Sequence, residues 1–535
     1  MKFLTFGLLL LTTVAHAQIT LTGNGTMQGN FTITDGAVTA LTLSASPMFG
    51  YTETSTKQGS TVPSVSYGMQ RIWDSSGMQW PSLSSCTTFN SNGTPCNTTT
   101  NLPTYTWTNL DTMLANDYSI GATEVMYTLA RTPPWASANP SDTTSCHDMG
   151  TALGQGNGEC YPPNDLNADG TGTDAIWKDW VTQLAKHAND PTYLTGSKKH
   201  AHIRYYEIWN EPDGTCNSTS QCFFKGSFAQ LARLTEDARC IILGSQGGKN
   251  VIHDHGDGTA TPCTATAIDP TAMIVMSSTH AKDGMAVEYT QNELYCSSTS
   301  DLTGNRAYQL PCPNPKNAIA AAIDVINVHM KPGNEGTTTS HCGPKGTSLC
   351  SVETGMQWYV ANIQAVLQPA ELTKPFWDGE ASYCPNGFTD SNCTSYANKD
   401  LAASFFPRFY LMSWSLGISG VAYYDWTTLQ SQAGPQGETA MQQTINWLQG
   451  STLTAPCTAT GTVWSCTITK AGQQYGIVWD SSQTCTGSSG NCTTSTQTVA
   501  SCWGHYQDMT SASTAVAMPS SHSIQVGIKP TIMSW

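Results

Sequence analysis

The sequence predicts an α/β fold, a (β/α)8 TIM barrel that carries an accessory all-β sandwich domain. From residue 61 to residue 448, short apolar runs alternate with amphipathic runs of helical period, which is the pattern of parallel strands joined by helices. In residues 449–535, short Thr-rich stretches with alternating polarity indicate antiparallel strands of a C-terminal β-sandwich. The same texture occurs in residues 18–60, so we expect these N-terminal strands to associate with the sandwich.

Seven strands and four helices of the barrel can be identified from these patterns. The strand candidates are residues 64–74, 123–137, 203–213, 272–280, 324–331, 375–383 and 420–426. The clearest helix candidates are residues 175–188, 224–242, 355–367 and 400–417. About eight such units suit a (β/α)8 barrel, and its closure is inferred because one strand is not identified.

Residues 1–17 have the features of a signal peptide. The basic residue Lys2 precedes an apolar run, and Ala15 and Ala17 form the small-residue pattern of a cleavage site before Gln18. No later apolar run is long enough to span a bilayer. We therefore expect a secreted protein, extracellular or periplasmic.

The cysteines fit an oxidising compartment. The chain has 19 of them, and many lie close enough in sequence to staple loops. Proximity suggests the pairs Cys86/Cys96, Cys146/Cys160, Cys216/Cys222, Cys296/Cys312, Cys342/Cys350, Cys384/Cys393, Cys457/Cys466 and Cys485/Cys492. Because the count is odd, at least one of the remaining Cys240, Cys263 and Cys502 is free or pairs outside the chain.

The charge content limits the class of partner. Charged residues make up 11% of the chain and the net charge is -15, so nucleic acid and anionic membranes are poor partners. Neutral polymers such as polysaccharides are compatible with this surface. No motif implies a cofactor, and the oligomeric state is left open.

Polar and aromatic side chains follow almost every strand candidate. In a parallel barrel the carboxyl ends of the strands meet on one face, so these side chains converge on one concave site. The candidate substrate-binding residues at these ends are Arg71, Trp135, Asn210, His280, His329 and Trp426.

Two glutamates at these ends suggest the chemistry of the site. Strand alternation puts Glu207, Trp209 and Glu211 on one face, and Pro212 stops the strand where Glu211 reaches the barrel mouth. Glu380 follows another apolar strand and a glycine that allows close approach of the backbone. At the ends of the fourth and seventh strands the two carboxyl groups face each other, as glycosidic bond cleavage requires.

The motifs "IWNEPD" and "WDGEAS" resemble the acid/base and nucleophile strands of clan A glycoside hydrolases, most nearly family 39, which includes β-xylosidase and α-L-iduronidase relatives. The resemblance implies a retaining glycosidase that acts on a carbohydrate substrate. It matches Glu211 to the general acid/base, Glu380 to the nucleophile and Asn210 to the partner of the sugar 2-hydroxyl.

The resemblance also assigns residues on two other strands. Trp426 matches the aromatic platform at the end of strand eight, and His329 matches a histidine on strand six. The tyrosine often found two residues after that histidine is Lys331 here, which departs from the family pattern.

Several alternatives stay open at this point. Asp378 is a rival for the nucleophile, and Arg71 either neutralises an acidic mouth or also orients Glu380. His280 and His329 are core histidines or sugar ligands. The chain as a whole is a family 39-like enzyme, an endo-acting clan A glucanase or mannanase, or a non-catalytic carbohydrate-binding protein on a barrel scaffold.

One stretch resembles a calcium loop. Asp165, Asn167 and Asp169 occupy the first, third and fifth positions, but Ile176 stands where a bidentate glutamate is needed. The alternative is an Asx-rich turn that caps the next helix. No other metal site is expected.

Overall fold

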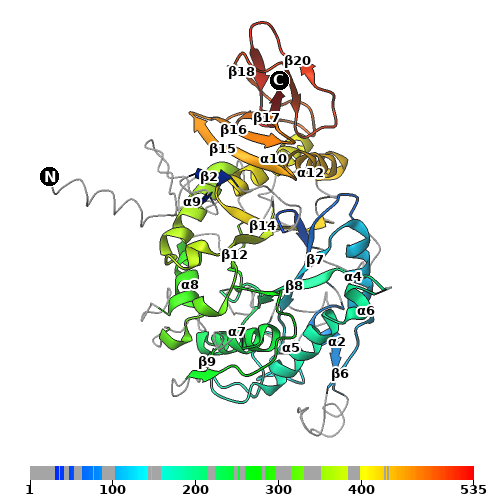
Figure 1. Cartoon of the computed structure of the whole chain (residues 1–535), viewed down its shortest axis with the longest axis vertical. Helices are drawn as coiled ribbons and strands as arrows, with labels where there is room; N and C mark the ends of the chain where they lie inside the picture. Colours follow the sequence, from blue (N-terminus) through cyan, green and yellow to red (C-terminus); the bar gives the residue numbers. More distant parts are fainter. Residues whose placement is uncertain are drawn as a thin grey trace, which may run out of the picture.

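The structure is a computed structural model, and its central unit is a closed parallel barrel surrounded by helices (Figure 1). Backbone and side chains are described for residues 47–52, 63–75, 77–86, 103–142, 146, 158–196, 198–213, 223–245, 261–279, 287–296, 312, 315–330, 351–382, 398–426, 429 and 433–535, and the backbone alone for 31–34, 37–40, 251–253, 260 and 284–286.

Eight parallel strands form the barrel sheet. In chain order they are β3 (Gly50–Thr52), β4 (Met69–Ile72), β7 (Glu124–Leu129), β8 (His202–Ile208), β11 (Met273–Val275), β12 (Ile326–Val328), β13 (Phe376–Ala381) and β14 (Ile418–Tyr424). A parallel bridge between Val275 and Val325 joins β11 to the start of β12 and closes the ring. The predicted (β/α)8 barrel is therefore confirmed.

The predicted boundary of the barrel at residue 61 is wrong. The first barrel strand is β3, which pairs with β14 on one side and β4 on the other. A three-residue strand is too short to show a pattern, so the sequence around it was grouped with the N-terminal strands. Of those, β1 (Phe31–Thr34) and β2 (Ala37–Ala40) form a hairpin, and β2 contacts the C-terminal strand β15.

Helices follow the strands and cover the outside of the barrel (Figure 1). The longer ones are α4 (Thr108–Ile120), α5 (Ala175–Ala188), α7 (Phe228–Leu243), α8 (Gly284–Tyr295), α9 (Val352–Val366), α10 (Lys399–Ser415) and α12 (Gly434–Leu448). The short ones are α2 (Trp80–Leu83), α6 (Pro191–Leu194), η4 (Pro315–Asn317), η5 (Ala320–Ala322) and η6 (Glu371–Thr373). None of the helices in these described ranges is long and apolar enough to cross a bilayer.

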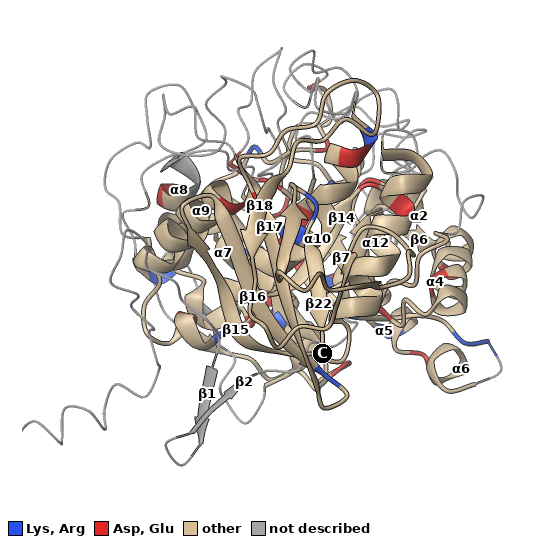
Figure 2. Ribbon diagram, turned by 90° about the horizontal axis from the view of Figure 1, so that it is seen from above, with Lys and Arg blue, Asp and Glu red and all other residues tan. Residues whose placement is uncertain are grey.

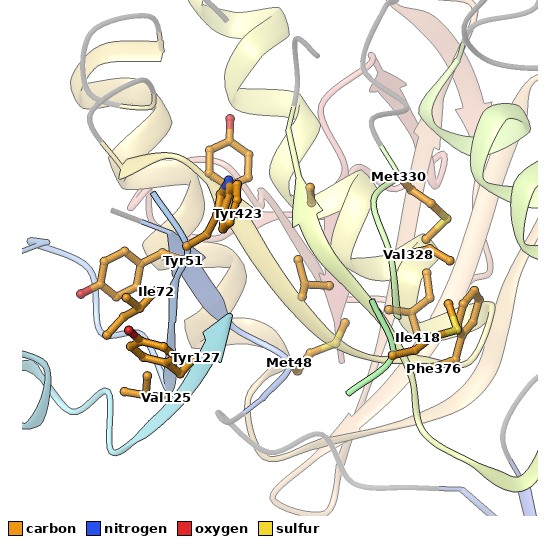
Figure 3. Close-up of a cluster of buried hydrophobic side chains, with 14 of the residues drawn as sticks. Met48, Tyr51, Ile72, Val125, Tyr127, Val328, Met330, Phe376, Ile418 and Tyr423 are labelled. Atoms are coloured by element: carbon orange, nitrogen blue, oxygen red, sulfur yellow. The ribbon is translucent and has the colours of Figure 1, made fainter. Parts of the chain in front are cut away.

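Two apolar layers hold the barrel together. The outer layer lies between the strands and the helices, where Tyr51, Ile72, Val125 and Tyr423 are almost completely buried (Figure 3). The inner layer fills the barrel axis and consists of Met69, Met126, Tyr205, Val275, Val325, Trp377 and Ala422. Because the axis is packed with side chains, the barrel interior is a core and the space for a ligand lies above it, at the carboxyl ends of the strands.

The C-terminal part is all β. One sheet has six strands, in the order β15 (Ser451–Thr460), β16 (Val463–Lys470), β17 (Gln473–Asp480), β22 (Thr531–Ser534), β19 (His505–Asp508) and β20 (Val516–Ala517). A second sheet pairs β18 (Ser495–Thr498) with β21 (Ser523–Val526). The larger sheet packs against α10 and α12 through β15 (Figure 2). Two small antiparallel pairs, β5 (Ser84–Ser85) with β6 (Thr104–Tyr105) and β9 (Val251–His253) with β10 (Ala260–Pro262), lie on loops of the barrel.

A buried ion pair joins this sheet to the barrel helices. Arg408 on α10 donates two hydrogen bonds to the carboxylate of Glu353 on α9, at 2.7 and 2.9 Å. The indole of Trp479 on β17 donates to the same carboxylate at 2.7 Å. All three side chains are completely buried, so the charges are satisfied by each other across the junction.

Five disulfides lie among the described residues. Four of them were predicted from sequence proximity, namely Cys146–Cys160, Cys296–Cys312, Cys457–Cys466 and Cys485–Cys492. The fifth, Cys240–Cys263, joins two cysteines that the sequence left unassigned, and Cys502 is exposed and free. The other expected pairs have at least one partner outside the described residues.

Candidate active site

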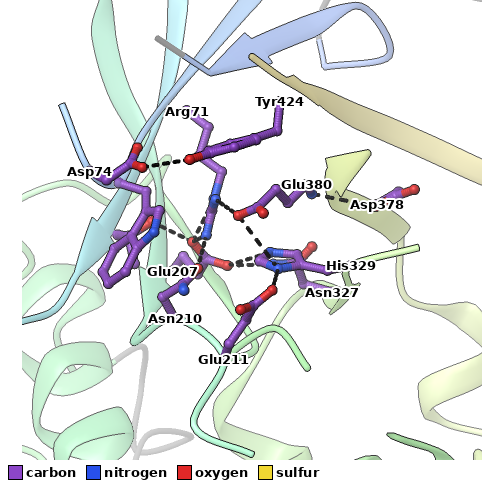
Figure 4. A network of polar contacts seen from close by, with 12 residues as sticks. Arg71, Asp74, Glu207, Asn210, Glu211, Asn327, His329, Asp378, Glu380 and Tyr424 are labelled. Atoms are coloured by element: carbon purple, nitrogen blue, oxygen red, sulfur yellow. Dashed lines mark hydrogen bonds and ion pairs between the residues drawn. The ribbon is translucent and has the colours of Figure 1, made fainter. Parts of the chain in front are cut away.

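The two candidate catalytic glutamates lie at the carboxyl ends of the fourth and seventh barrel strands, as predicted. Glu211 follows β8 and has a positive φ of 40°, while Glu380 is the fifth residue of β13. Both are almost completely buried (Figure 4). A carboxylate oxygen of Glu211, one of Glu380 and a ring nitrogen of His329 all lie within 4.8 Å of one another.

Strand alternation fails just before Glu211. Glu207 points into the barrel, but Trp209 has a φ of 69°, its indole donates to the carbonyl of Phe223, and it packs in the outer layer. The expectation that Trp209 shares a face with Glu207 and Glu211 is therefore wrong. A left-handed conformation is unfavourable for a bulky residue, and here it turns Glu211 toward the mouth.

Arg71 on β4 links the acidic groups of the site. Its Nη1 lies 2.9 Å from Oε2 of Glu380, its Nε donates to Glu207 at 2.9 Å, and its Nη2 donates to Oδ1 of Asn210 at 2.5 Å. The guanidinium is completely buried, and the attraction of Glu207 and Glu380 outweighs burial and raises its pKa. Arg71 therefore both neutralises the site and orients Glu380.

Glu207 is a site residue that the sequence analysis placed on the right face but gave no role. It is completely buried and accepts hydrogen bonds from the hydroxyl of Thr128 and from Nδ2 of Asn327, the latter at 2.7 Å. Burial opposes its ionisation, but Arg71, His329 and the Thr128 hydroxyl together outweigh burial, and the pKa of Glu207 is lowered. With its oxygens occupied by these donors, Glu207 fixes Arg71 and is not itself placed to attack a substrate.

His329 on the carboxyl side of β12 connects the two glutamates. Its Nδ1 lies 2.7 Å from Oε1 of Glu211 and 3.7 Å from Oε2 of Glu380. Burial lowers the pKa of His329, but Glu380, Glu207 at 3.8 Å and the hydrogen bond to Glu211 together outweigh it, so the net pKa is raised. Of the two interpretations, core histidine or ligand, the structure puts His329 within the candidate site.

The glycine before Glu380 is required by a close contact. A Cβ at Gly379 would lie 2.5 Å from Oδ1 of Asn327, closer than side chains tolerate. Asp378, the rival nucleophile, accepts from the backbone N–H of Met330 at 3.0 Å and points away from Glu211 in Figure 4. The geometry therefore favours Glu380 over Asp378 as the group that faces Glu211.

Asn210 presents one free polar atom to the site. Its Oδ1 is held by Arg71, and within the described residues its buried Nδ2 has no hydrogen-bond partner. A buried donor without a partner costs free energy, so this N–H is available to a ligand oxygen.

The two tryptophans that were predicted to contact substrate pack against other aromatic rings. Trp426 is completely buried and packs edge-on against Tyr67 at 6.0 Å between ring centroids, and its role as a sugar platform stays a prediction. Trp135 is 7% exposed and packs against Trp80. His280 lies outside the described residues.

The calcium-like loop forms a cap for α5. Asp165 accepts from the backbone N–H of Ala175 at 2.7 Å, and Asp169 accepts from the N–H and the hydroxyl of Thr171. Asn167 donates to the hydroxyl of Thr171 at 2.9 Å. These side chains are used in the turn, which is the alternative that the sequence left open.

Among the described residues, Glu211, His329 and Glu380 are the one group with the spacing of three metal ligands. Arg71, bonded to Glu380 at 2.9 Å, already supplies a positive charge there. A second cation at this position would be repelled, so the triad is better suited to holding protons than a metal ion.

No family model and no curated protein sequence matches the chain. Solved structures do match it. A family GH39 enzyme from Xanthomonas axonopodis pv. citri is 13% identical, with 92% of this chain and 94% of that chain covered and a TM-score of 0.46. A monomeric β-xylosidase from Caulobacter crescentus CB15 is 12% identical, with 92% and 97% covered and a TM-score of 0.49.

A GH30 endoxylanase from Clostridium papyrosolvens C71 is 12% identical, with 92% of this chain and 97% of that chain covered and a TM-score of 0.44. All three identities are below 25% and all three TM-scores below 0.5. The function proposed below is therefore based on the geometry of the site.

Proposed function

We propose that the chain is a secreted retaining glycoside hydrolase that cleaves O-glycosidic bonds of a poly- or oligosaccharide. The observation that carries this proposal is the approach of the Glu211 and Glu380 carboxylate oxygens to within 4.8 Å at the mouth of the barrel. Retaining glycosidases hold two carboxyl groups about 5–5.5 Å apart, whereas inverting ones need roughly 6.5–9.5 Å to admit a water.

In the first step Glu380 attacks the anomeric carbon while Glu211 protonates the departing oxygen. The contact with Arg71 at 2.9 Å keeps Glu380 in the anionic form that attack requires. Nδ1 of His329 and Oε1 of Glu211 are only 2.7 Å apart, and a hydrogen bond between them needs a proton on one of the two atoms. This pair therefore holds the proton that Glu211 delivers.

In the second step Glu211 takes a proton from water, and the hydroxide attacks the anomeric carbon of the glycosyl-enzyme ester. The sugar leaves with its original anomeric configuration, and Glu380 is released as the carboxylate. The free Nδ2 of Asn210 lies beside Arg71, where a hydroxyl of the bound sugar would accept its hydrogen bond.

Secretion is supported by two independent features. Residues 1–17 have the pattern of a signal peptide, and five disulfides lie within the described part of the chain. Structural disulfides persist in oxidising compartments, which is where an extracellular polysaccharide would be met.

The experiment is product release from aryl glycosides and polysaccharides, with wild type, Glu211→Gln and Glu380→Gln compared. β-Xylosides come first because of the motif resemblance to family 39. The anomeric configuration of the first product is followed by NMR. We expect wild type to release a product with retained anomeric configuration. Both variants should lose activity by a factor on the order of 10²–10⁴ or more. Inversion of configuration, or full activity of Glu380→Gln, would falsify the mechanism.

A further inference from the structure

A second polar constellation lies next to the catalytic residues and has unused hydrogen-bonding groups. Asp74 follows β4 and accepts from the hydroxyl of Tyr424, at the end of β14, at 2.8 Å. Figure 4 shows this pair on the side of Glu380 that faces away from Glu211. In the described residues, Oδ1 of Asp74 is buried and has no hydrogen-bond partner.

Arg131 belongs to the same region. It follows β7, is 2% exposed, and its guanidinium carbon lies 4.9 Å from the ring centroid of Trp73. Within the described ranges its buried Nε and Nη1 have no hydrogen-bond partner. Arg131 also has a positive φ of 64°, a conformation that non-glycine residues adopt mainly where the surrounding structure imposes it.

Asp74 and Arg131 follow the adjacent strands β4 and β7, and the ring of Trp73, the residue before Asp74, lies under the Arg131 guanidinium. Burial lowers the pKa of Arg131 while Glu159 and Asp74 oppose that shift, and burial raises the pKa of Asp74 to about 6. Yet the acceptor of one and the donors of the other remain unused. Buried polar groups are almost always hydrogen-bonded, so a ligand with both donors and acceptors is expected between them.

We propose that Asp74 and Arg131 bind two neighbouring hydroxyl groups of the sugar that is transferred to Glu380. A hydroxyl donates to Oδ1 of Asp74 while its neighbour accepts from the Arg131 guanidinium, and each unused atom gains a partner. The proposal rests on the proposed function, because it assigns the pair to the glycone side of that site.

The charges around the pair select a neutral sugar. The glycone would lie against two carboxylates, Glu380 and Asp74, and within the described residues the buried Oδ1 of Asp74 has no hydrogen-bond partner. A third carboxylate from a uronic acid would be repelled, whereas hydroxyl groups add no charge. The substrate class is therefore a neutral glycoside with two free adjacent hydroxyls on the glycone.

The test compares substrates that lack single hydroxyls. The 4-nitrophenyl glycoside that wild type cleaves best is prepared with each ring hydroxyl removed in turn, and kcat/KM is measured for wild type, Asp74→Asn and Arg131→Lys. Arg204→Lys is the matched control, because Arg204 pairs with Glu124 at the amino ends of the strands. Thermal unfolding of each variant reports whether it is folded.

We expect Asp74→Asn and Arg131→Lys to lose about 10- to 100-fold in kcat/KM on the full substrate. Wild-type kcat/KM should fall by a similar factor when one of two adjacent hydroxyls is removed from the substrate. For each variant, removal of that same hydroxyl should lower kcat/KM by less than about a further threefold. A folded variant that loses the same factor as wild type for every analogue would overturn the proposal. So would a uronate glycoside cleaved faster than its neutral counterpart.

A second readout separates this proposal from the proposed function. Migration in gels that contain xylan, β-glucan or mannan measures binding without turnover. If wild type cleaves a glycoside but the analogue test fails, the hydrolase stands and the hydroxyl pair is wrong. If nothing is cleaved but retardation by a polysaccharide is lost in both variants, the pair stands and the hydrolase is wrong. Neither cleavage nor retardation by wild type would overturn both.

Discussion

Nδ1 of His329 and Oε1 of Glu211 are 2.7 Å apart in a buried site, so the two side chains titrate as a pair. The pKa of His329 is raised above its usual value although burial alone would lower it, because Glu380, Glu207 and the hydrogen-bonded Glu211 favour the protonated ring. The pair therefore keeps a proton beyond the pH at which an isolated glutamic acid would lose it.

This arrangement predicts the alkaline limb of the pH profile. Wild-type kcat/KM should fall above about pH 6.5, where an unperturbed histidine would already be deprotonated. In His329→Asn the limb should move to lower pH, because Glu211 alone must then hold the proton. The check is kcat/KM from pH 4 to pH 9 on an unactivated substrate. An unchanged limb would show that His329 takes no part in protonation.

Replacing Arg71 should destabilise the fold as well as the site. Arg71→Met leaves the completely buried Glu207 without its cation, and breaking a buried pair from one side typically costs about 3–5 kcal/mol. Denaturant unfolding gives the difference directly. The double variant Arg71→Met/Glu207→Gln removes both charges and should recover part of the loss. If the two substitutions are simply additive, the ion pair is not the source of the cost.

Glu293 on α8 should make the protein less stable as the pH rises. Burial raises the pKa of this 2% exposed carboxyl to about 8, although the Ser277 hydroxyl donates to it. The folded state therefore holds a proton that the unfolded chain releases near pH 4.5, and stability is lost between about pH 4.5 and pH 8. Glu293→Gln should unfold at a higher temperature than wild type at pH 9 and lose this difference at pH 4. A constant difference would contradict the assignment.

Chelators should leave the activity unchanged. Although Glu211, His329 and Glu380 have the spacing of metal ligands, the cation of Arg71 is bonded to one of them. Activity after prolonged dialysis against EDTA is expected to equal that of untreated protein. Loss on dialysis with recovery on adding a divalent ion would identify a metal enzyme instead.

The sequence predicted the elements that carry local patterns. Seven strands, the helix over residues 175–188 and the strand-end positions of Glu211 and Glu380 were found because periodicity and short motifs are local properties. β3 was missed because three residues cannot show a period. Cys240–Cys263 was missed because their separation of 23 residues exceeds that of the neighbouring pairs.

The interior of the site could not be predicted in the same way. In the sequence Glu207 is one residue of an alternating strand with nothing to mark it out. Its role depends on contact with Arg71, which lies 136 positions away in sequence. Trp209 was placed on the wrong face because alternation assumes an extended backbone, and its φ is 69°. Trp426 was assigned by resemblance, and its packing against Tyr67 could not be predicted from the sequence.

The carboxylate of Glu353 has a further consequence for how the molecule unfolds. Its partners come from a barrel helix and from the C-terminal sheet, so separating the two parts would strip a buried carboxylate of the Trp479 hydrogen bond and admit water to the Arg408 pair. Removal of the all-β part at residue 449 is thus expected to destabilise the barrel. The stability of the catalytic half is therefore expected to depend in part on a strand that follows it in the chain.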